Sequence, residues 1–198
     1  MSVRQSLLAL LDLQPMYGYQ LRSEFEARTG STWPLNIGQV YTTLGRLQRD
    51  GLVVVDSDDD DGHTTYAITD AGRNEVRAWF TTPVQRDAPP RDELAIKLAL
   101  AVTVPGVDVY AVVQTQRTAT IQALQEYTRL KHKAGDGTDP GELAWLLVLD
   151  SLVFQAEAEV RWLDHCESRL LRAAARPAAA TDPTPASTPT PERKKARR

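Results

Sequence analysis

The chain has 198 residues, of which 42% are hydrophobic and 25% are charged, and its formal net charge is −3. This composition indicates a globular protein of one or two domains with enough apolar side chains for a core. No apolar run approaches the roughly 18 residues that span a bilayer, and the N-terminus lacks a signal-peptide layout, so we expect a cytoplasmic protein with no membrane partner.

Few residues offer metal or catalytic chemistry. The single cysteine, Cys166, excludes an internal disulfide. The chain has only three histidines besides this cysteine, which makes a structural zinc site improbable. A packed helix thiol is favoured over a redox sensor at this position. The run from Asp58 to Asp61 precedes a glycine as in a calcium loop, but the final ligand position of such a loop falls on Ile68, which favours a solvated turn. Without a nucleophile beside a base or a phosphate-binding glycine loop, we expect no enzyme activity, no metal and no cofactor.

Three short helices are predicted in the first 50 residues. The first spans residues 3–12 and cannot continue through Pro15. The second follows Gly18, which can adopt a left-handed conformation, and it stops at Gly30. The third starts at Asn36. Apolar residues at helical spacing give each helix a core face: Val3, Leu7, Leu8, Leu10 and Leu11 in the first, Tyr19, Leu21 and Phe25 in the second, and Val40, Leu44 and Leu47 in the third.

The opposite face of the third helix has the chemistry of major-groove recognition. If Asn36 caps this helix, its side-chain oxygen accepts from the backbone N–H near Gln39. Gln39, Thr42, Arg46 and Arg49 then gather on one face. Arginine fits the two acceptors of guanine, glutamine pairs bidentately with adenine, and threonine offers a hydroxyl and a methyl group. The alternative is an ordinary solvated helix face.

A glycine, Gly45, lies at the edge of the same face. Glycine inside a helix costs roughly 1 kcal/mol relative to alanine. Close approach of a DNA phosphate would account for its presence.

The overall charge is not the basic balance expected of a nucleic-acid-binding protein. Its distribution is uneven, because the acidic run at residues 58–61 concentrates negative charge in one turn. Local field matters more than the total, and five arginines are spread through the region of the three helices and the hairpin: Arg22, Arg28, Arg46, Arg49 and Arg73.

A hairpin and a fourth helix follow. Two β-rich runs lie between Leu52 and Thr69, with residues 57–62 as the tip that joins them. A helix is predicted over residues 70–80, where Asp70 suits the positive N-terminal dipole. This order is typical of a winged helix, so the expected fold class is mainly α with a small β-hairpin wing.

The second half of the chain is predicted to be helical, over residues 91–104, 108–133 and 142–174. The last helix begins apolar on almost every side, which requires burial beyond what one small domain offers, so we expect a second copy of the chain to cover it. Trp145 and Trp162 are 17 residues apart on this helix and are expected to share one aromatic face for a flat ligand, with ordinary packing as the alternative.

These elements predict four parts. Residues 1–82 form a winged helix-turn-helix DNA-binding domain, and residues 83–90 form a linker marked by Pro83, Pro89 and Pro90. Residues 91–176 form a helical domain for dimerisation and ligand binding. Residues 177–198 form a disordered proline-rich tail, whose basic end either attracts phosphates or is simply solvated.

Three blocks of sequence resemble the PadR family of transcriptional regulators. They are MYGYQL at residues 16–21, IGQVYTTLGRLQRDGLV at residues 37–53 and YAITDAG at residues 66–72, in the family's order and spacing. The resemblance implies a winged helix-turn-helix that binds a palindromic operator as a homodimer through a helical C-terminal domain. Together with the cap residue Asn36, the DNA-binding positions that it implies are Tyr17 near the phosphates, Gln39, Tyr41, Thr42, Thr43 and Arg46 in the recognition helix, and His63, Thr64 and Thr65 in the wing arm.

Two departures from the family pattern affect the expected DNA contacts. Many relatives have a basic wing tip, whereas this tip is acidic, which argues against deep insertion of the wing into the minor groove. Many relatives also have proline after the recognition-helix tyrosine, where this chain has Thr42.

The function expected from the sequence is a homodimeric repressor that a small, flat ligand releases from double-stranded operator DNA. A regulator without a ligand is one alternative. A winged helix that binds another protein is a second, and it agrees with the acidic tip and the negative net charge.

Overall fold

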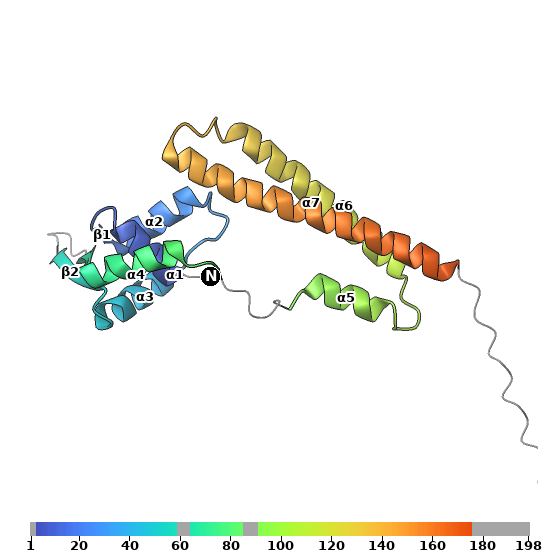
Figure 1. Ribbon diagram of the computed structural model, residues 1–198, viewed down its shortest axis with the longest axis horizontal. Helices are drawn as coiled ribbons and strands as arrows, with labels where there is room; N and C mark the ends of the chain where they lie inside the picture. Colours follow the sequence, from blue (N-terminus) through green and yellow to red (C-terminus); the bar gives the residue numbers. More distant parts are fainter. Residues whose placement is uncertain (1–2, 59–63, 85–90, 176–198) are drawn as a thin grey trace, which may run out of the picture.

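The computed structural model describes residues 3–58, 64–84 and 91–175. Figure 1 shows an N-terminal unit of short helices and strands beside a long helical hairpin, with a separate short helix lying under the far part of the hairpin. In chain order the elements are α1 (Val3–Leu11), β1 (Met16–Tyr17), α2 (Gly18–Arg28), α3 (Ile37–Arg49), β2 (Val53–Asp58), β3 (Thr64–Ile68), α4 (Asp70–Thr81), α5 (Glu93–Ala101), α6 (Val109–Lys133) and α7 (Pro140–Ala174).

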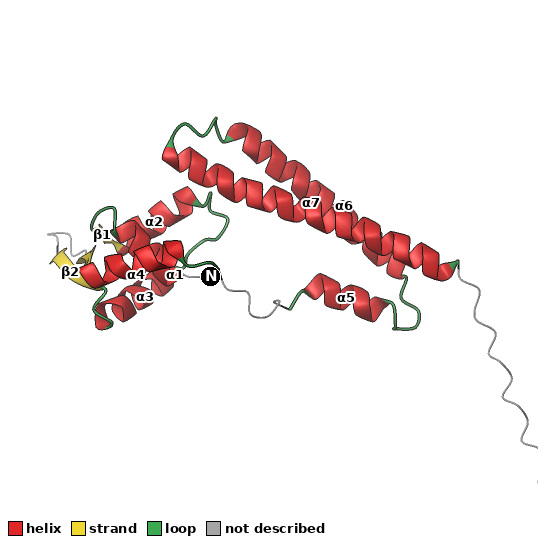
Figure 2. Ribbon diagram, viewed as in Figure 1, coloured by secondary structure: helices red, strands yellow, loops and turns green. Residues whose placement is uncertain are grey.

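The fold class expected from the sequence is confirmed: the described residues are mostly helical, with a small antiparallel sheet (Figure 2). The sheet has three strands in the order β1-β3-β2, with Met16 opposite Tyr66 and Val53 opposite Ile68. A bulge between Val55 and Ser57 bends the hairpin. The sequence did not predict β1, because a two-residue strand has no periodicity of its own.

The core of the N-terminal unit forms around α1. The side chains of Leu7 and Leu8 are completely buried, and α1 packs against α2, α3, α4 and β3. The apolar stripe of α3 lies in the same core, so the hydrophobic spacing of the first and third helices is confirmed. Burial of each large aliphatic side chain contributes about 1.5–3 kcal/mol, which makes this cluster the main source of stability for the unit.

Two expectations about α2 are wrong. Gly18 is not left-handed; it is the first residue of α2, where a Cβ would lie 2.6 Å from the Tyr41 ring. Tyr19 was expected in the core, but 54% of it is exposed. The helix instead buries Leu21 and Phe25. The positive φ values occur at its other end, at Gly30 and Ser31, where the chain turns toward α3.

The helical hairpin consists of α6 and α7, which lie side by side along most of their length (Figure 1). Leu149, Ala156 and Leu163 of α7 are buried at seven-residue intervals, a spacing that keeps them on the side that faces α6. Polar contacts also join the two helices: Glu159 accepts from Thr120 Oγ1 at 2.5 Å, and Lys131 pairs with Asp150 at 2.5 Å.

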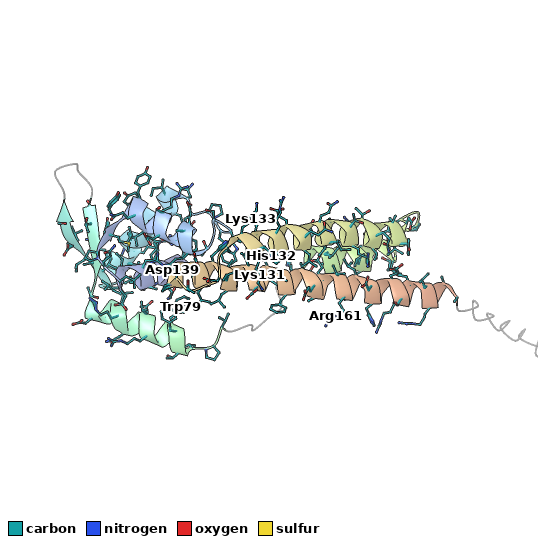
Figure 3. The ribbon with its side chains drawn as sticks, turned by 90° about the horizontal axis from the view of Figure 1, so that it is seen from above. Trp79, Lys131, His132, Lys133, Asp139 and Arg161 are labelled. Carbon is teal, nitrogen blue, oxygen red and sulfur yellow. The ribbon has the colours of Figure 1, made fainter. Side chains whose placement is uncertain are left out.

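The turn of this hairpin lies at the end nearest the N-terminal unit. Figure 3 labels residues 131–133 at the end of α6 and Asp139 at the start of α7 in this region. Asp139 caps α7 by accepting from the backbone N–H groups of Gly141 and Glu142, which is why the helix starts at Pro140 and not at residue 142 as expected. The Trp145 ring lies against Gly30, so α7 contacts the end of α2.

The tight junction of α4 with the hairpin gives a first prediction. A Cβ at Gly72 would collide with the Leu52 carbonyl oxygen and would lie 2.6 Å from Ile68 Cγ1, and neither a backbone oxygen nor a buried branched side chain can move cheaply. We expect Gly72→Ala to lower the free energy of unfolding by about 2–4 kcal/mol in urea denaturation.

Gly45→Ala is the matched control, because a Cβ there would meet no atom within 4 Å. Alanine is the better helix former, so this change should raise stability by about 0.5–1 kcal/mol. Equal effects of the two substitutions would contradict the packing described at Gly72.

Candidate nucleic-acid interface

Helix α3 starts sharply at Asn36. This residue has an extended backbone, with φ −72° and ψ 130°, and its Oδ1 accepts from the backbone N–H of Gly38 at 2.8 Å. The cap was expected, but its partner was expected to be the N–H near Gln39. The bond to Gly38 satisfies one of the unpaired N–H groups of the first turn in the same way.

The two faces of α3 are as predicted from the sequence. Val40, Leu44 and Leu47 are completely buried, which fixes the rotation of the helix about its axis. The opposite face carries exposed side chains, and the side chains of Gln39 and Arg46 have no hydrogen-bond or ion-pair partner among the described residues. Exposed side chains without partners keep their donors and acceptors for a ligand that approaches from solvent. The predicted residues on this face are Gln39, Tyr41, Thr42, Arg46 and Arg49, with Thr43 half-buried beside them.

The two threonines of α3 present a restricted chemistry. Thr42 Oγ1 donates to the Gly38 carbonyl at 2.7 Å, and Thr43 Oγ1 donates to the Gln39 carbonyl at 2.7 Å. Because each hydroxyl hydrogen is used within the helix, each side chain offers lone pairs and a methyl group outward. That combination suits a thymine methyl or a donor on a base edge.

Four tyrosines meet beside this face. Burial raises the pKa of Tyr41, and the neighbouring phenols of Tyr19, Tyr66 and Tyr17 raise it further, so Tyr41 is a neutral donor at physiological pH. Tyr17 is the N-cap residue of α2, and its backbone N–H donates to Gln20 Oε1 at 3.1 Å. Sequence reasoning missed this cluster; the only signal for it was the Gly18 that lets the Tyr41 ring approach α2.

The structure places only part of the wing. Thr64 and Thr65 lie half-buried in β3, where Thr65 is opposite Tyr17 of β1 and Ser57 of β2. His63 and the acidic residues 59–61 lie outside the described residues. The wing arm is therefore joined to the Tyr17 region by direct strand pairing.

Ion pairs decide which arginines of the N-terminal unit are available. Arg22 pairs with Glu26 at 2.8 Å, and Arg28 pairs with Glu24. The same holds for Arg73, whose partner is Asp12 at 3.5 Å, and for Arg4, which pairs with Asp50 at 2.6 Å and Glu75 at 3.2 Å. Of the five arginines singled out in the sequence, three are thus paired, whereas Arg46 and Arg49 have no carboxylate partner within the described part of the chain. Of these five arginines, the two without a carboxylate partner both lie on α3.

The two tryptophans predicted to bind a ligand do not form one face. Seventeen residues correspond to about 4.7 turns and about 25 Å of helix, so the side chains point about 100° apart. Trp145 packs on Gly30 at the end of α2. Trp162 instead lines a pocket between α5, α6 and α7. The expectation of a shared aromatic face is wrong.

The comparisons with known proteins agree with this geometry. The sequence model of the "Transcriptional regulator PadR-like family" matches residues 7–78, from the middle of α1 to most of α4. Residues 7–78 are thus similar to the PadR-like family of transcriptional regulators. A second family model, "Virulence activator alpha C-term", matches residues 90–170 of this PadR-like chain. The PadR-like family consists of transcriptional regulators and not of enzymes.

Relatives and solved structures cover most of the chain. It is 25% identical over 185 residues to the "Probable transcriptional regulator Rv1176c" of Mycobacterium tuberculosis, a match that spans 86% of this chain and 98% of that protein. Bacillus subtilis PadR in complex with operator DNA is 19% identical, with a TM-score of 0.67 over 85% of this chain and 99% of that one. The Vibrio cholerae virulence activator AphA is 23% identical, with a TM-score of 0.66 over 87% and 99%. These structures show that the fold is shared.

The described residues provide neither a metal cluster nor a membrane span. No group of three or more histidine, cysteine, aspartate or glutamate side chains is placed to hold a metal ion there. No described helix is both long and apolar enough to cross a bilayer.

The cap of α3 gives the second prediction. Asn36→Ala removes the acceptor for the Gly38 N–H and should lower the free energy of unfolding by about 1 kcal/mol, measured by urea denaturation. Asn36→Ser keeps a capping oxygen and should restore most of that stability. If the serine variant is as unstable as the alanine variant, the cap is not what Asn36 contributes.

Proposed function

We propose that this PadR-like chain is a homodimeric repressor that binds a palindromic operator through α3 and releases it when a small ligand binds. The observation that carries the proposal is the exposed face of α3, where the side chains of Gln39 and Arg46 lack partners among the described residues and Arg49 adds unpaired charge. A rigid helix with a buried stripe on one side and unsatisfied polar groups on the other is suited to enter a major groove.

The proposed contacts divide into base readout and phosphate positioning. Arg46 would read guanine and Gln39 adenine, while the methyl groups of Thr42 and Thr43 contact thymine. Tyr41, with its neutral phenol, would donate to a phosphate. Tyr17 and the wing residues Thr64 and Thr65 would hold the backbone on one flank, and we propose the same role for His63, which lies outside the described residues. Bacillus subtilis PadR, which shares the fold, was solved in complex with operator DNA.

The proposed dimer forms through the C-terminal helices. Leu147 and Phe154 of α7 are 62% and 67% exposed in the single chain, and Leu143 is 48% exposed. At 100° per residue these three lie about 120–160° around α7 from Leu149, which is buried on the side that faces α6. A second copy that covers them would place two α3 helices about 34 Å apart, one turn of DNA.

A small-molecule effector is part of the proposal. Bacillus subtilis PadR was also solved in complex with p-coumaric acid, and it has a TM-score of 0.69 to this chain. Trp145 at the α2 contact and Trp162 in the helical domain are two separate candidate positions for an aromatic ligand. A ligand acts as inducer only if it binds the released state better, and a typical coupling would weaken operator binding by about 5- to 150-fold.

The alternative of a protein-binding winged helix has one observation in its favour. The exposed Asp56 of β2 precedes the acidic run of residues 58–61 in the sequence and would repel a phosphate backbone. A gel shift on the DNA upstream of the protein's own gene separates the alternatives. A retarded band that survives excess nonspecific DNA supports the repressor, and its absence supports protein docking.

Arg46 provides the third prediction. Arg46→Ala should weaken operator binding by about 1–3 kcal/mol and relax the preference at one base position, because it removes a bidentate contact while leaving the buried stripe intact. The measurement is a gel-shift titration against operator variants. Arg172→Ala, on the last turn of α7, is the control of equal charge and should leave the affinity unchanged. A uniform weakening on all DNA sequences would reassign Arg46 to phosphate contact.

The dimer provides the fourth prediction. Leu147→Asp places an unpaired carboxylate in the proposed apolar interface, at a cost of several kcal/mol, so sedimentation should show monomers. Operator affinity should fall with it, because two linked half-sites gain from a high effective concentration. Ser168→Asp, at an exposed position about 21 Å beyond Phe154 along the same helix, should remain dimeric. A stable Leu147→Asp dimer would show that α7 uses another face.

A further inference from the structure

The helical domain contains an apolar pocket far from α3. It has a volume of about 330 Å³ and lies between α5, α6 and α7. Leu98 of α5, Val113 of α6 and Trp162 of α7 form three of its walls. Apart from Arg169, every residue that lines it is apolar or a cysteine. Its size and lining are those of a small-molecule site, in which a mostly apolar cavity is combined with very few polar groups.

Arg169 is a cation without a counter-charge at this pocket. Its Nε donates to His165 Nε2 at 2.9 Å, which orients the guanidinium. No ion pair joins it to any carboxylate of the described residues. The two acidic residues nearest to it along α7 are engaged elsewhere: Glu167 accepts from Tyr110 Oη at 3.0 Å, and Asp164 pairs with Arg117 at 2.7 Å. The terminal nitrogens of Arg169 therefore keep their donors for an incoming group.

Cys166 and Arg169 line the same pocket. Burial raises the pKa of this thiol, and the charge of Arg169 partly opposes the rise. The thiol is thus neutral and forms part of the apolar wall, while the guanidinium lies close enough for its field to be felt there. One end of the pocket is positive and the remainder is apolar.

We propose that this pocket binds a small monocarboxylate with an apolar body of one or two rings, with the ligand's carboxylate paired to Arg169. A guanidinium presents parallel N–H donors that match the two carboxylate oxygens, and such charge-assisted pairs are stronger than neutral hydrogen bonds. The apolar body would replace water against Leu98, Val113 and Trp162. Organic cations are excluded by the charge of Arg169.

The position of α5 connects this site to the DNA-binding unit, a step that rests on the proposed function. Four residues of α5 and its end line the pocket: Ala95, Leu98, Ala99 and Val102. Within α5 only Leu98 and Ala101 are buried, so few contacts hold it in place. A ligand in the pocket would change how α5 packs against α6 and α7. Because α5 is the first described helix after the winged helix-turn-helix, a shift of α5 can be passed along the chain to the DNA-binding unit.

Binding is tested without DNA in the full chain. Phe replaces Trp33, Trp79 and Trp145, so that Trp162 alone fluoresces; the probes are 2-naphthoate and its neutral isostere 2-naphthamide. We expect saturable quenching by naphthoate and binding of the amide weaker by about tenfold or more, since a charge-assisted pair contributes at least about 1.4 kcal/mol. Arg169→Gln should weaken naphthoate by the same factor and leave the amide unchanged.

Controls distinguish the pocket from adventitious binding. Arg161→Gln removes an equal charge from an exposed position of α7 that does not line the pocket, labelled in Figure 3, and should change nothing. Ala99→Phe fills the cavity and should abolish binding of both probes. Equal binding of acid and amide, or an unchanged naphthoate affinity in Arg169→Gln, would overturn the assignment.

A gel shift without ligand, run in parallel, separates this inference from the proposed function. If the protein binds its operator but not naphthoate, the proposed ligand site is refuted and the proposed repressor function is not. If the protein binds naphthoate through Arg169 but does not bind its operator, the ligand site is supported and the repressor function is refuted.

Discussion

The burial of three aliphatic side chains of α3 against α1 is the constraint on which the DNA-binding unit depends. Val40, Leu44 and Leu47 are completely inaccessible, and replacing one such residue by alanine typically costs about 2–5 kcal/mol. Their spacing leaves one rotation for the helix, and that rotation decides which side chains face solvent. Specific recognition needs this fixed geometry, because a small rotation of the helix would misalign the bidentate hydrogen bonds that distinguish one base from another.

The positive charge of the DNA-binding unit is also unevenly available, because some arginines have carboxylate partners and others do not. Arg22, Arg28 and Arg73 end in ion pairs that hold elements together, so they contribute little to the outer field. Arg46 and Arg49 remain without carboxylate partners among the described residues. A chain with net charge −3 can therefore carry a positive recognition helix, since acidic residues pair with Arg22, Arg28 and Arg73 and not with the two arginines of α3.

The features that could be predicted from the sequence are those that arise from local periodicity. The stripe of α3, the cap at Asn36 and the two long helices follow from spacing and capping alone. What failed depended on distant partners. Tyr19 and Gly18 were misplaced because the Tyr41 ring, 22 residues beyond Tyr19, decides the packing of α2. β1 depends on pairing with β3. The two tryptophans of α7 are the exception, because 17 residues are about 4.7 turns and helix geometry alone places them about 100° apart. The lack of a partner for Arg169 could not be predicted either, because the acidic residues near it on α7 are engaged by residues of α6.

The contact between Trp145 and Gly30 holds the start of the long helix α7 against the DNA-binding unit, so a small tilt of α7 moves its two ends by very different distances. From Trp145 to its last residue the helix extends about 44 Å, at 1.5 Å per residue, and its near end bears on the backbone that leads from α2 to α3. A tilt of about 5° pivoting there moves the far end by about 4 Å, and the converse also holds. The same tilt moves the first residue of α7, five residues before Trp145, by only about 0.7 Å. Displacements of this size are enough to form or break the hydrogen bonds of a recognition helix.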